Sequence, residues 1–322
     1  EVLARLDRLT ILRRKLFAGK LPGERRSKRR GQSVEFDDYR PYARGDDLRQ
    51  LDWNVLARFD RLVLKLFREE EDQTLHLYLD ASASMLAGGK AGLAGTVPAQ
   101  STKLAAAARL TMALAAVGLS QQNRVVISVL GAPPRSGNSG AGGTRTLQPI
   151  RGRRNIRRAG EFVVEAIADA AREMPRVDVA AQLRRLALAR RGQGVAVLLS
   201  DLFIEDGASG TGLEDALGAL VVPKGFDAAC IRVLAPAEPD PSLDRDAGLI
   251  GDLRLTDVET SRGVEVTVSR GVLERYRERF EAHAERVSRV CASRDVTLMT
   301  VLSDEDPADV LLGVLRQRGV LG

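Results

Sequence analysis

The chain has 322 residues, of which 44% are hydrophobic, and a formal net charge of +6; this size suits one large α/β domain with a smaller appended piece. Its cysteines, Cys230 and Cys291, lie far apart and no Cys-x-x-Cys pair occurs, which argues against a disulfide framework and a zinc site. Because the sequence contains neither a run of about 18 apolar residues nor a leader segment, we expect a cytoplasmic protein without a membrane span.

Residues 1–72 are expected to form an N-terminal helical and extended segment. Apolar residues recur at helical spacing through residues 2–21, which predicts an amphipathic helix that ends before Pro22. A short helix is predicted at residues 51–59 and a strand at residues 61–68. Between them and the first helix, residues 25–30 read Arg-Arg-Ser-Lys-Arg-Arg. Such a basic run is typical of a solvated arm, and it can also bind phosphates or acidic partners.

From residue 73 onward, predicted strands and helices alternate along the chain. The strands are expected at residues 74–79, 124–130, 145–150, 195–200, 228–234 and 296–302, and the helices at residues 103–119, 156–173, 178–190, 213–220, 273–291 and 307–317. This order predicts a Rossmann-like, doubly wound, mainly parallel sheet in a domain of residues 73–322.

A β-hairpin is expected as an insertion at about residues 251–270. Two segments with alternating apolar and polar residues, 254–259 and 264–269, flank Ser261-Arg262-Gly263. Alternation with a period of two on both sides of a turn is typical of a hairpin.

Oxygen-bearing side chains follow two of the predicted strands. Asp80, Ser82 and Ser84 come directly after the first sheet strand, and Asp201 follows the strand at residues 195–200. The carboxyl ends of parallel strands meet at one edge of a sheet, where ligands usually bind. Hard divalent cations such as magnesium prefer oxygen ligands. The pattern therefore indicates a metal site, although Asp and Ser are also ordinary turn residues that cap loops.

This Asp-x-Ser-x-Ser pattern with a later Ser-Asp resembles the metal-ion-dependent adhesion site (MIDAS) of a von Willebrand factor A domain. Residues 33–58 add Glu-Phe, Arg-x-Tyr, Gly-Asp-Asp-x-Arg and Asp-Trp elements. These resemble the signature of the family known as domain of unknown function 58. The resemblance runs from about residue 22 to the C-terminus, and it matches an Asp-x-Glu pair to Asp257 and Glu259. It implies a von Willebrand factor A-like fold.

The resemblance also implies a ligand set for Mg²⁺ or Mn²⁺. Asp80, Ser82 and Ser84 would bind the ion directly, and Asp201 directly or through water. A third loop would supply a threonine just before the aspartate that opens the next helix. Here Asp178 fits that aspartate as an N-cap, so the threonine position falls on Val177. Valine offers no oxygen, so water fills the position, or the ion binds weakly, or it does not bind.

The functional expectation is a non-enzymatic protein-binding module. The resemblance implies an adaptor that works with a MoxR-type AAA+ ATPase in the assembly or maturation of an unknown client protein. One alternative is binding of nucleic acid or an acidic partner through residues 25–30. Another is a metal-dependent hydrolase built on Asp46, Asp47 and Asp52. Ion pairing of these aspartates with the nearby Arg40, Arg44 and Arg49 is favoured over that site.

Overall fold

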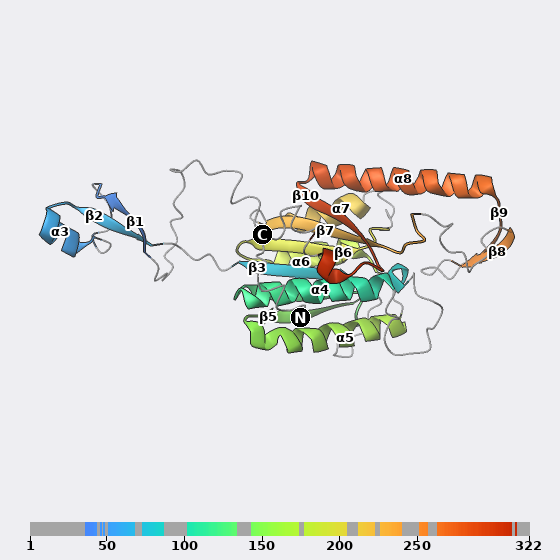
Figure 1. Cartoon of the computed structure of the whole chain (residues 1–322), viewed down its shortest axis with the longest axis horizontal. Helices are drawn as coiled ribbons and strands as arrows, with labels where there is room; N and C mark the ends of the chain where they lie inside the picture. The colour runs from blue at the N-terminus through green and yellow to red at the C-terminus, as the bar shows by residue number, and fades with distance from the viewer. Residues whose placement is uncertain are drawn as a thin grey trace. The chain divides into compact units, whose positions relative to one another are not determined.

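The computed structural model describes residues 36–43, 46, 48, 51–67, 73–86, 102–133, 143–173, 177–204, 212–222, 226–239, 251–256, 263–310 and 313. They fall into two compact units: the smaller lies within Lys20–Asp72, and the larger contains the residues from Gln73 onward (Figure 1). The predicted helix at residues 2–21, the basic run at residues 25–30 and the pair Asp257 and Glu259 lie outside the described residues.

The smaller unit contains a two-stranded antiparallel sheet. Strand β1 (Phe36–Pro41) pairs with β2 (Val63–Phe67), and helix α3 (Trp53–Phe59) lies between them in the chain. Asp52 caps α3, because its carboxylate accepts hydrogen bonds from the backbone N–H groups of Asn54 and Val55. The predicted helix and strand of this unit are confirmed. Strand β1 was not predicted.

The larger unit is built on a six-stranded sheet with the order β10-β7-β6-β3-β4-β5. Its strands are β3 (Thr74–Asp80), β4 (Arg124–Leu130), β5 (Thr144–Ile150), β6 (Gly194–Ser200), β7 (Phe226–Leu234) and β10 (Val296–Leu302). All neighbouring strands are parallel except β4 and β5, which are antiparallel. The predicted mainly parallel α/β sheet is confirmed.

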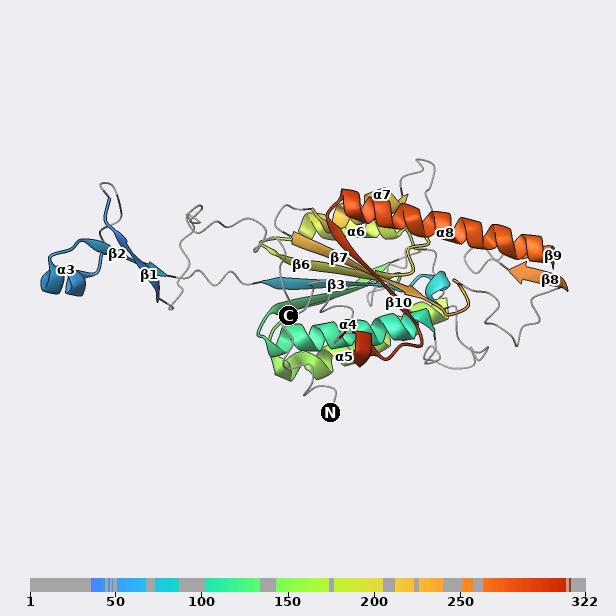
Figure 2. The ribbon, with the colours of Figure 1, turned by 45° about the horizontal axis from the view of Figure 1, so that its top comes forward.

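Helices cover both faces of this sheet (Figure 2). Helices α4 (Lys103–Ser120) and α5 (Ile156–Glu173) pack on one face, and the short α9 (Pro307–Asp309) lies beside α4. Helices α6 (Val179–Ala189), α7 (Gly212–Leu220) and the last turns of α8 (Arg270–Ser293) pack on the other. The central strands thus lie between two apolar layers, which explains why they are buried along most of their length, whereas the edge strand β5 is mostly exposed or half-buried.

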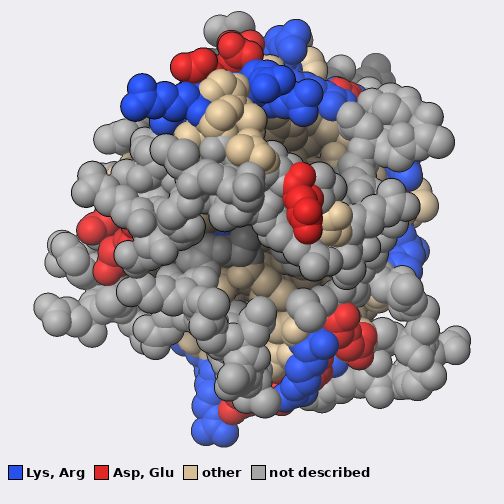
Figure 3. Space-filling model, turned by 90° about the vertical axis from the view of Figure 1, so that its right-hand side faces the viewer, with Lys and Arg blue, Asp and Glu red and all other residues tan. Residues whose placement is uncertain are grey.

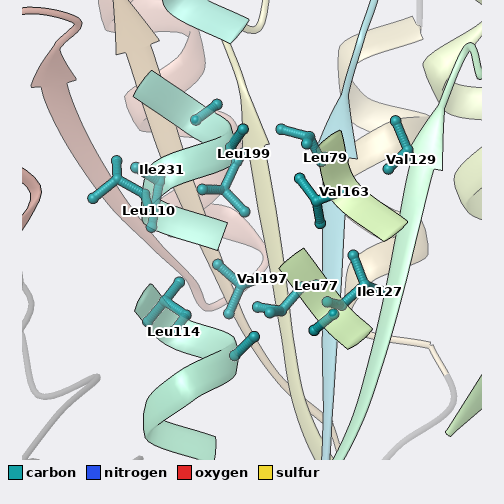
Figure 4. Packing of buried hydrophobic residues seen from close by; sticks show 14 of the residues in the cluster. Leu77, Leu79, Leu110, Leu114, Ile127, Val129, Val163, Val197, Leu199 and Ile231 are labelled. Atoms are coloured by element: carbon teal, nitrogen blue, oxygen red, sulfur yellow. The ribbon is translucent and has the colours of Figure 1, made fainter. Parts of the chain in front are cut away.

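The core beneath α4 and α5 is made of branched aliphatic side chains. Leu77 and Leu79 of β3 point toward the same layer as Val197 and Leu199 of β6 (Figure 4). Leu110 and Leu114 of α4, Val163 of α5, Ile127 and Val129 of β4 and Ile231 of β7 complete the part of the cluster labelled in that figure. This layer fixes where the strands end, and hence where the loops after them begin.

Among the described helices, α4 is long and apolar enough to cross a membrane by length and composition alone. However, 72% of it is buried inside the protein, so core packing accounts for its apolar character. The expected cytoplasmic location and the expected lack of a membrane span stay predictions.

The predicted hairpin is confirmed by strands β8 (Gly251–Thr256) and β9 (Gly263–Val268), which pair antiparallel. Helix α8 follows β9 almost at once and therefore begins earlier than the predicted residue 273. The first four turns of α8 contain no buried residue, whereas Val287, Val290 and Cys291 near its end are buried. Its beginning thus extends past the apolar layer of the sheet (Figure 1).

Candidate functional site at the carboxyl edge of the sheet

The structure brings the predicted oxygen-bearing residues of two loops together at one edge of the sheet. Asp80 ends β3, Asp201 directly follows β6, and these two strands are neighbours. The hydroxyl of Ser200 donates a 2.6 Å hydrogen bond to Oδ2 of Asp80, which connects the two loops. Figure 3 looks at the end of the molecule where β3 finishes; the largest group of Lys and Arg side chains there lies at the top, over the beginning of α8.

Asp80 is almost fully buried, and both of its carboxylate oxygens have partners. Oδ1 accepts a 2.9 Å hydrogen bond from the backbone N–H of Ser82, and Oδ2 accepts the hydrogen bond from Ser200. Burial and the charge of Asp201 raise the pKa of Asp80 to about 6, against the opposing effect of these hydrogen bonds. The hydroxyls of Ser82 and Ser84 lie 3.1 Å apart and bond to each other.

Asp201 is paired with a lysine that the sequence pattern did not indicate. Its Oδ1 accepts a hydrogen bond from the backbone N–H of Phe203, and its Oδ2 lies 2.7 Å from Nζ of Lys103. The side chain of Lys103, the first residue of α4, is 1% exposed. Burial opposes a charged ammonium, but the carboxylates of Asp201 and Glu238 outweigh it, so the pKa of Lys103 is raised above its ordinary value.

Glu238 is the second partner of Lys103 and lies in the loop after β7. Its Oε1 accepts a hydrogen bond from Nζ of Lys103, and its Oε2 accepts one from the backbone N–H of Ala235. Its backbone carbonyl accepts a 2.8 Å hydrogen bond from the hydroxyl of Tyr276. Lys103 therefore joins the loops after β6 and β7 to the start of α4, and α8 braces the second of these loops.

Aromatic and cationic side chains pack around this network. The guanidinium of Arg232 lies 5.5 Å from the ring centre of Phe203 and 5.2 Å from that of Phe280, distances typical of cation–π contacts. The ring of His283 stacks on Phe203. Between Asp201 and Phe203, Leu202 has a φ of 60°. A bulky residue in the left-handed region is unusual and marks a backbone held by its surroundings.

The arrangement leaves little for a divalent cation to bind. All carboxylate oxygens of Asp80, Asp201 and Glu238 accept hydrogen bonds from the chain itself. Within the described parts of the chain, no group of three or more His, Cys, Asp and Glu side chains is placed to hold a metal ion. A divalent ion at this edge would have to compete with Lys103 for Oδ2 of Asp201, and magnesium or manganese binding stays a prediction.

Comparison with models of known families assigns the chain to a family. The model of a family described as protein of unknown function DUF58 matches residues 38–290, which is more than half of the chain. The chain belongs to the DUF58 family. The match extends from β1 to the last turns of α8 and so includes Asp80, Lys103, Asp201 and Glu238. No curated protein matches the chain.

The third loop of this DUF58 chain carries no oxygen at the expected position. Asp178 caps α6, because its Oδ1 accepts a 2.8 Å hydrogen bond from the backbone N–H of Ala181. This confirms the predicted N-cap. Val177, directly before it, is half-buried and packs against the apolar cluster of α6 and α7. Val177 thus contributes to the core.

Lys103 and Glu238 are the site residues that sequence reasoning missed in this DUF58 protein. One signal was present, because a lysine at the first position of a helix faces the positive end of the helix dipole. Such a lysine needs acidic neighbours, and α4 has no acidic residue in its first turn. The neighbours had to come from elsewhere in the chain. The sequence does not say from where.

The aspartates of the hydrolase alternative have structural partners where they are described. Asp46 forms a 2.7 Å ion pair with Arg40, which confirms the predicted ion pairing at this position. Asp52 caps α3 and accepts a 3.0 Å hydrogen bond from the hydroxyl of Tyr39. Asp47 lies outside the described residues.

Proposed function

We propose that this DUF58 protein is a non-enzymatic adaptor that binds other proteins through the carboxyl edge of its large sheet. Its partner would be a MoxR-type AAA+ ATPase, and the pair would act in the assembly or maturation of a client protein. We also propose that the larger unit is von Willebrand factor A-like. The doubly covered parallel sheet and the Asp-x-Ser-x-Ser loop after β3 support that assignment.

The observation that carries the proposal is the closed hydrogen-bond network at this edge. The carboxylates of Asp80, Asp201 and Glu238 accept hydrogen bonds from three separate parts of the chain, and Lys103 links two of these carboxylates. Such a network is suited to fixing the shape of three loops, and a fixed shape is what recognition of a protein surface requires.

Exposed aromatic side chains next to the network support a binding role. Phe203 is 37% exposed and Tyr276 is 38% exposed, although both contact residues of the network. Tyrosine and phenylalanine are enriched in protein–protein interfaces, because a large apolar ring gains much contact area for little loss of conformational freedom. We therefore place the partner-binding surface around the loop after β6 and the beginning of α8.

The test is binding of the purified chain to a MoxR-type ATPase from the same genome, measured by size-exclusion chromatography and interferometry. We expect a stable complex that Tyr276→Ala weakens about tenfold or more, as for a central interface residue. The matched control is Leu188→Ala on α6, since Leu188 is 85% exposed and lies at the end of α6 that leads into the start of β6. Equal binding by both variants and the wild type, or no complex at all, would overturn the proposal.

The nucleic-acid alternative depends on residues 25–30, which lie outside the described residues. Its test is retention on single- and double-stranded DNA at increasing salt, because phosphate contacts weaken steeply as counterions are added. A charge reversal at Arg29 and Arg30 that leaves retention unchanged would eliminate it.

A further inference from the structure

We propose that Lys103 is the built-in cation of the edge site, and that its ammonium does the work a divalent metal ion would do there. The chain then supplies both the positive charge and the carboxylates that surround it. This inference goes beyond the adaptor role and does not depend on which partner binds.

The positive charge of Lys103 lies at the carboxyl edge of the sheet, next to an expected metal ligand. Nζ of Lys103 lies 2.7 Å from Oδ2 of Asp201, one of the two aspartates of the expected metal-ligand set, and it also bonds to Oε1 of Glu238. A metal ion at this edge would join the loops after neighbouring strands by binding oxygen atoms from each. Lys103 connects the loops after β6 and β7 through Asp201 and Glu238, and the hydrogen bond from Ser200 to Asp80 connects the ends of β6 and β3.

Lys103 and Asp201 are both buried. The side chains of Lys103 and Asp201 are 1% and 2% exposed. An ammonium is almost never fully buried unless it is paired, since its loss of hydration must be compensated by charge and hydrogen bonds. Two carboxylates and the ring of Phe203, whose centre lies 5.4 Å from Nζ, provide that compensation. The surroundings of Nζ therefore stabilise a fixed positive charge.

Lys103 is anchored on a well-packed helix. Lys103 is the first residue of an 18-residue helix that packs in the core. Thr102 caps the helix, because its hydroxyl accepts a hydrogen bond from the backbone N–H of Ala105. The ammonium is thus held at one end of a buried helix, whereas a metal ion would exchange with solvent.

The remaining positions expected to bind a metal ion are Asp80, Ser82, Ser84 and Val177. Ser82 and Ser84 bond to each other, Ser200 donates to Asp80, and Val177 has no oxygen. Each of these side chains therefore already has a hydrogen-bond partner in the chain or, as in Val177, has no oxygen. In addition, Glu238 gives the cation a carboxylate from this chain, where a metal site would leave a position open for a partner's carboxylate. The three loops are consequently held together permanently.

The experiment is calorimetric titration of MgCl₂ and MnCl₂ into the full-length, chelator-treated wild type. We expect no saturable heat. Saturable binding that disappears in Asp80→Ala would overturn the proposal. This titration requires neither a folded Lys103 variant nor a partner protein. A result against the proposed role of Lys103 can therefore be distinguished from a result against the adaptor role.

A second measurement tests whether lysine and metal are equivalent. In Lys103→Met the charge is lost but the bulk is kept, so millimolar MnCl₂ is expected to raise the melting temperature of this variant and not that of the wild type. The control Lys103→Arg keeps the charge and is expected to remain insensitive to MnCl₂. Equal stabilisation of the wild type and Lys103→Met, or stabilisation of neither, would contradict the equivalence.

Discussion

The ammonium of Lys103 lies 2.7 Å from Oδ2 of Asp201, although 98 positions separate the two residues in the chain. This contact connects the start of α4 with the end of β6 and buries both charges. The attraction between the two charges offsets the free-energy cost of removing each of them from water. The contact therefore predicts how the stability of the protein responds when either residue is changed.

Removing the charge of Lys103 is expected to be costly. Lys103→Met leaves the buried carboxylate of Asp201 without its cation, and breaking a buried pair in this way typically costs about 3–5 kcal/mol of unfolding free energy. Asp201→Asn is expected to cost less, because Lys103 keeps Glu238 as a partner. Urea unfolding of the two single variants and the double variant measures the coupling. Strictly additive losses in the double variant would show that the two side chains do not interact.

Gly194 is expected to be irreplaceable at the start of β6. A Cβ atom added there would lie 1.9 Å from the carbonyl oxygen of Thr74 on the neighbouring β3. Because two backbones cannot separate without losing ladder hydrogen bonds, Gly194→Ala should destabilise the fold by about 1–3 kcal/mol or more. The control is Gly271→Ala in the first turn of α8, where an added Cβ meets nothing within 4 Å. Equal melting temperatures of the two variants would contradict the close approach of Gly194 to the backbone of β3.

His76 should make the protein sensitive to acid between pH 6.5 and about 4. Burial, followed by the charges of Arg190 and Arg124, lowers the pKa of His76 to about 4. In this pH range the unfolded chain takes up a proton that the folded protein does not, so stability falls as the pH falls. The shift corresponds to about 3 kcal/mol. His76 is buried against the rings of Tyr78 and Phe226, so the comparison must separate packing from titration.

The informative measurement is the difference in unfolding free energy between His76→Leu and the wild type at several pH values. A loss of packing changes this difference by the same amount at every pH. Loss of the titrating imidazole has an additional effect below pH 6.5, because the wild type then loses stability as the pH falls and the variant does not lose this contribution. The pKa of Asp80 is raised to about 6, so its contribution to stability increases as the pH falls, which is opposite to that of His76. Asp80 is present in both the wild type and His76→Leu. It therefore cancels in the comparison. A difference that does not vary with pH would refute the assignment.

Long buried elements could be predicted from the sequence, and one polar strand could not. The predicted boundaries agree with the structure for β4, β10 and α5, where runs of branched residues or a clear helical period reflect burial. Strand β1 reads Phe-Asp-Asp-Tyr-Arg-Pro and shows no apolar alternation. It is extended because β2 pairs with it, and that partner is about 25 residues away in the chain.

The candidate site was predictable in place but not in chemistry. The order of strands and helices indicated that Asp80 and Asp201 would lie at the same edge of a parallel sheet, and they do, at the ends of the neighbouring strands β3 and β6. What these carboxylates bind depends on side chains from loops and helix ends elsewhere in the chain. Lys103 is 135 positions from Glu238, and no local pattern links the two residues. The identity of the cation therefore had to come from the folded structure.

The most direct test of the account is the melting temperature of the wild type in EDTA compared with excess MgCl₂. A metal ion that bound the folded state alone would add about 2.7 kcal/mol of stability at 100 times its dissociation constant. Because Lys103 already provides the cation, the account predicts the same melting temperature in both buffers. A rise of several degrees with magnesium that Asp80→Ala abolishes would contradict it.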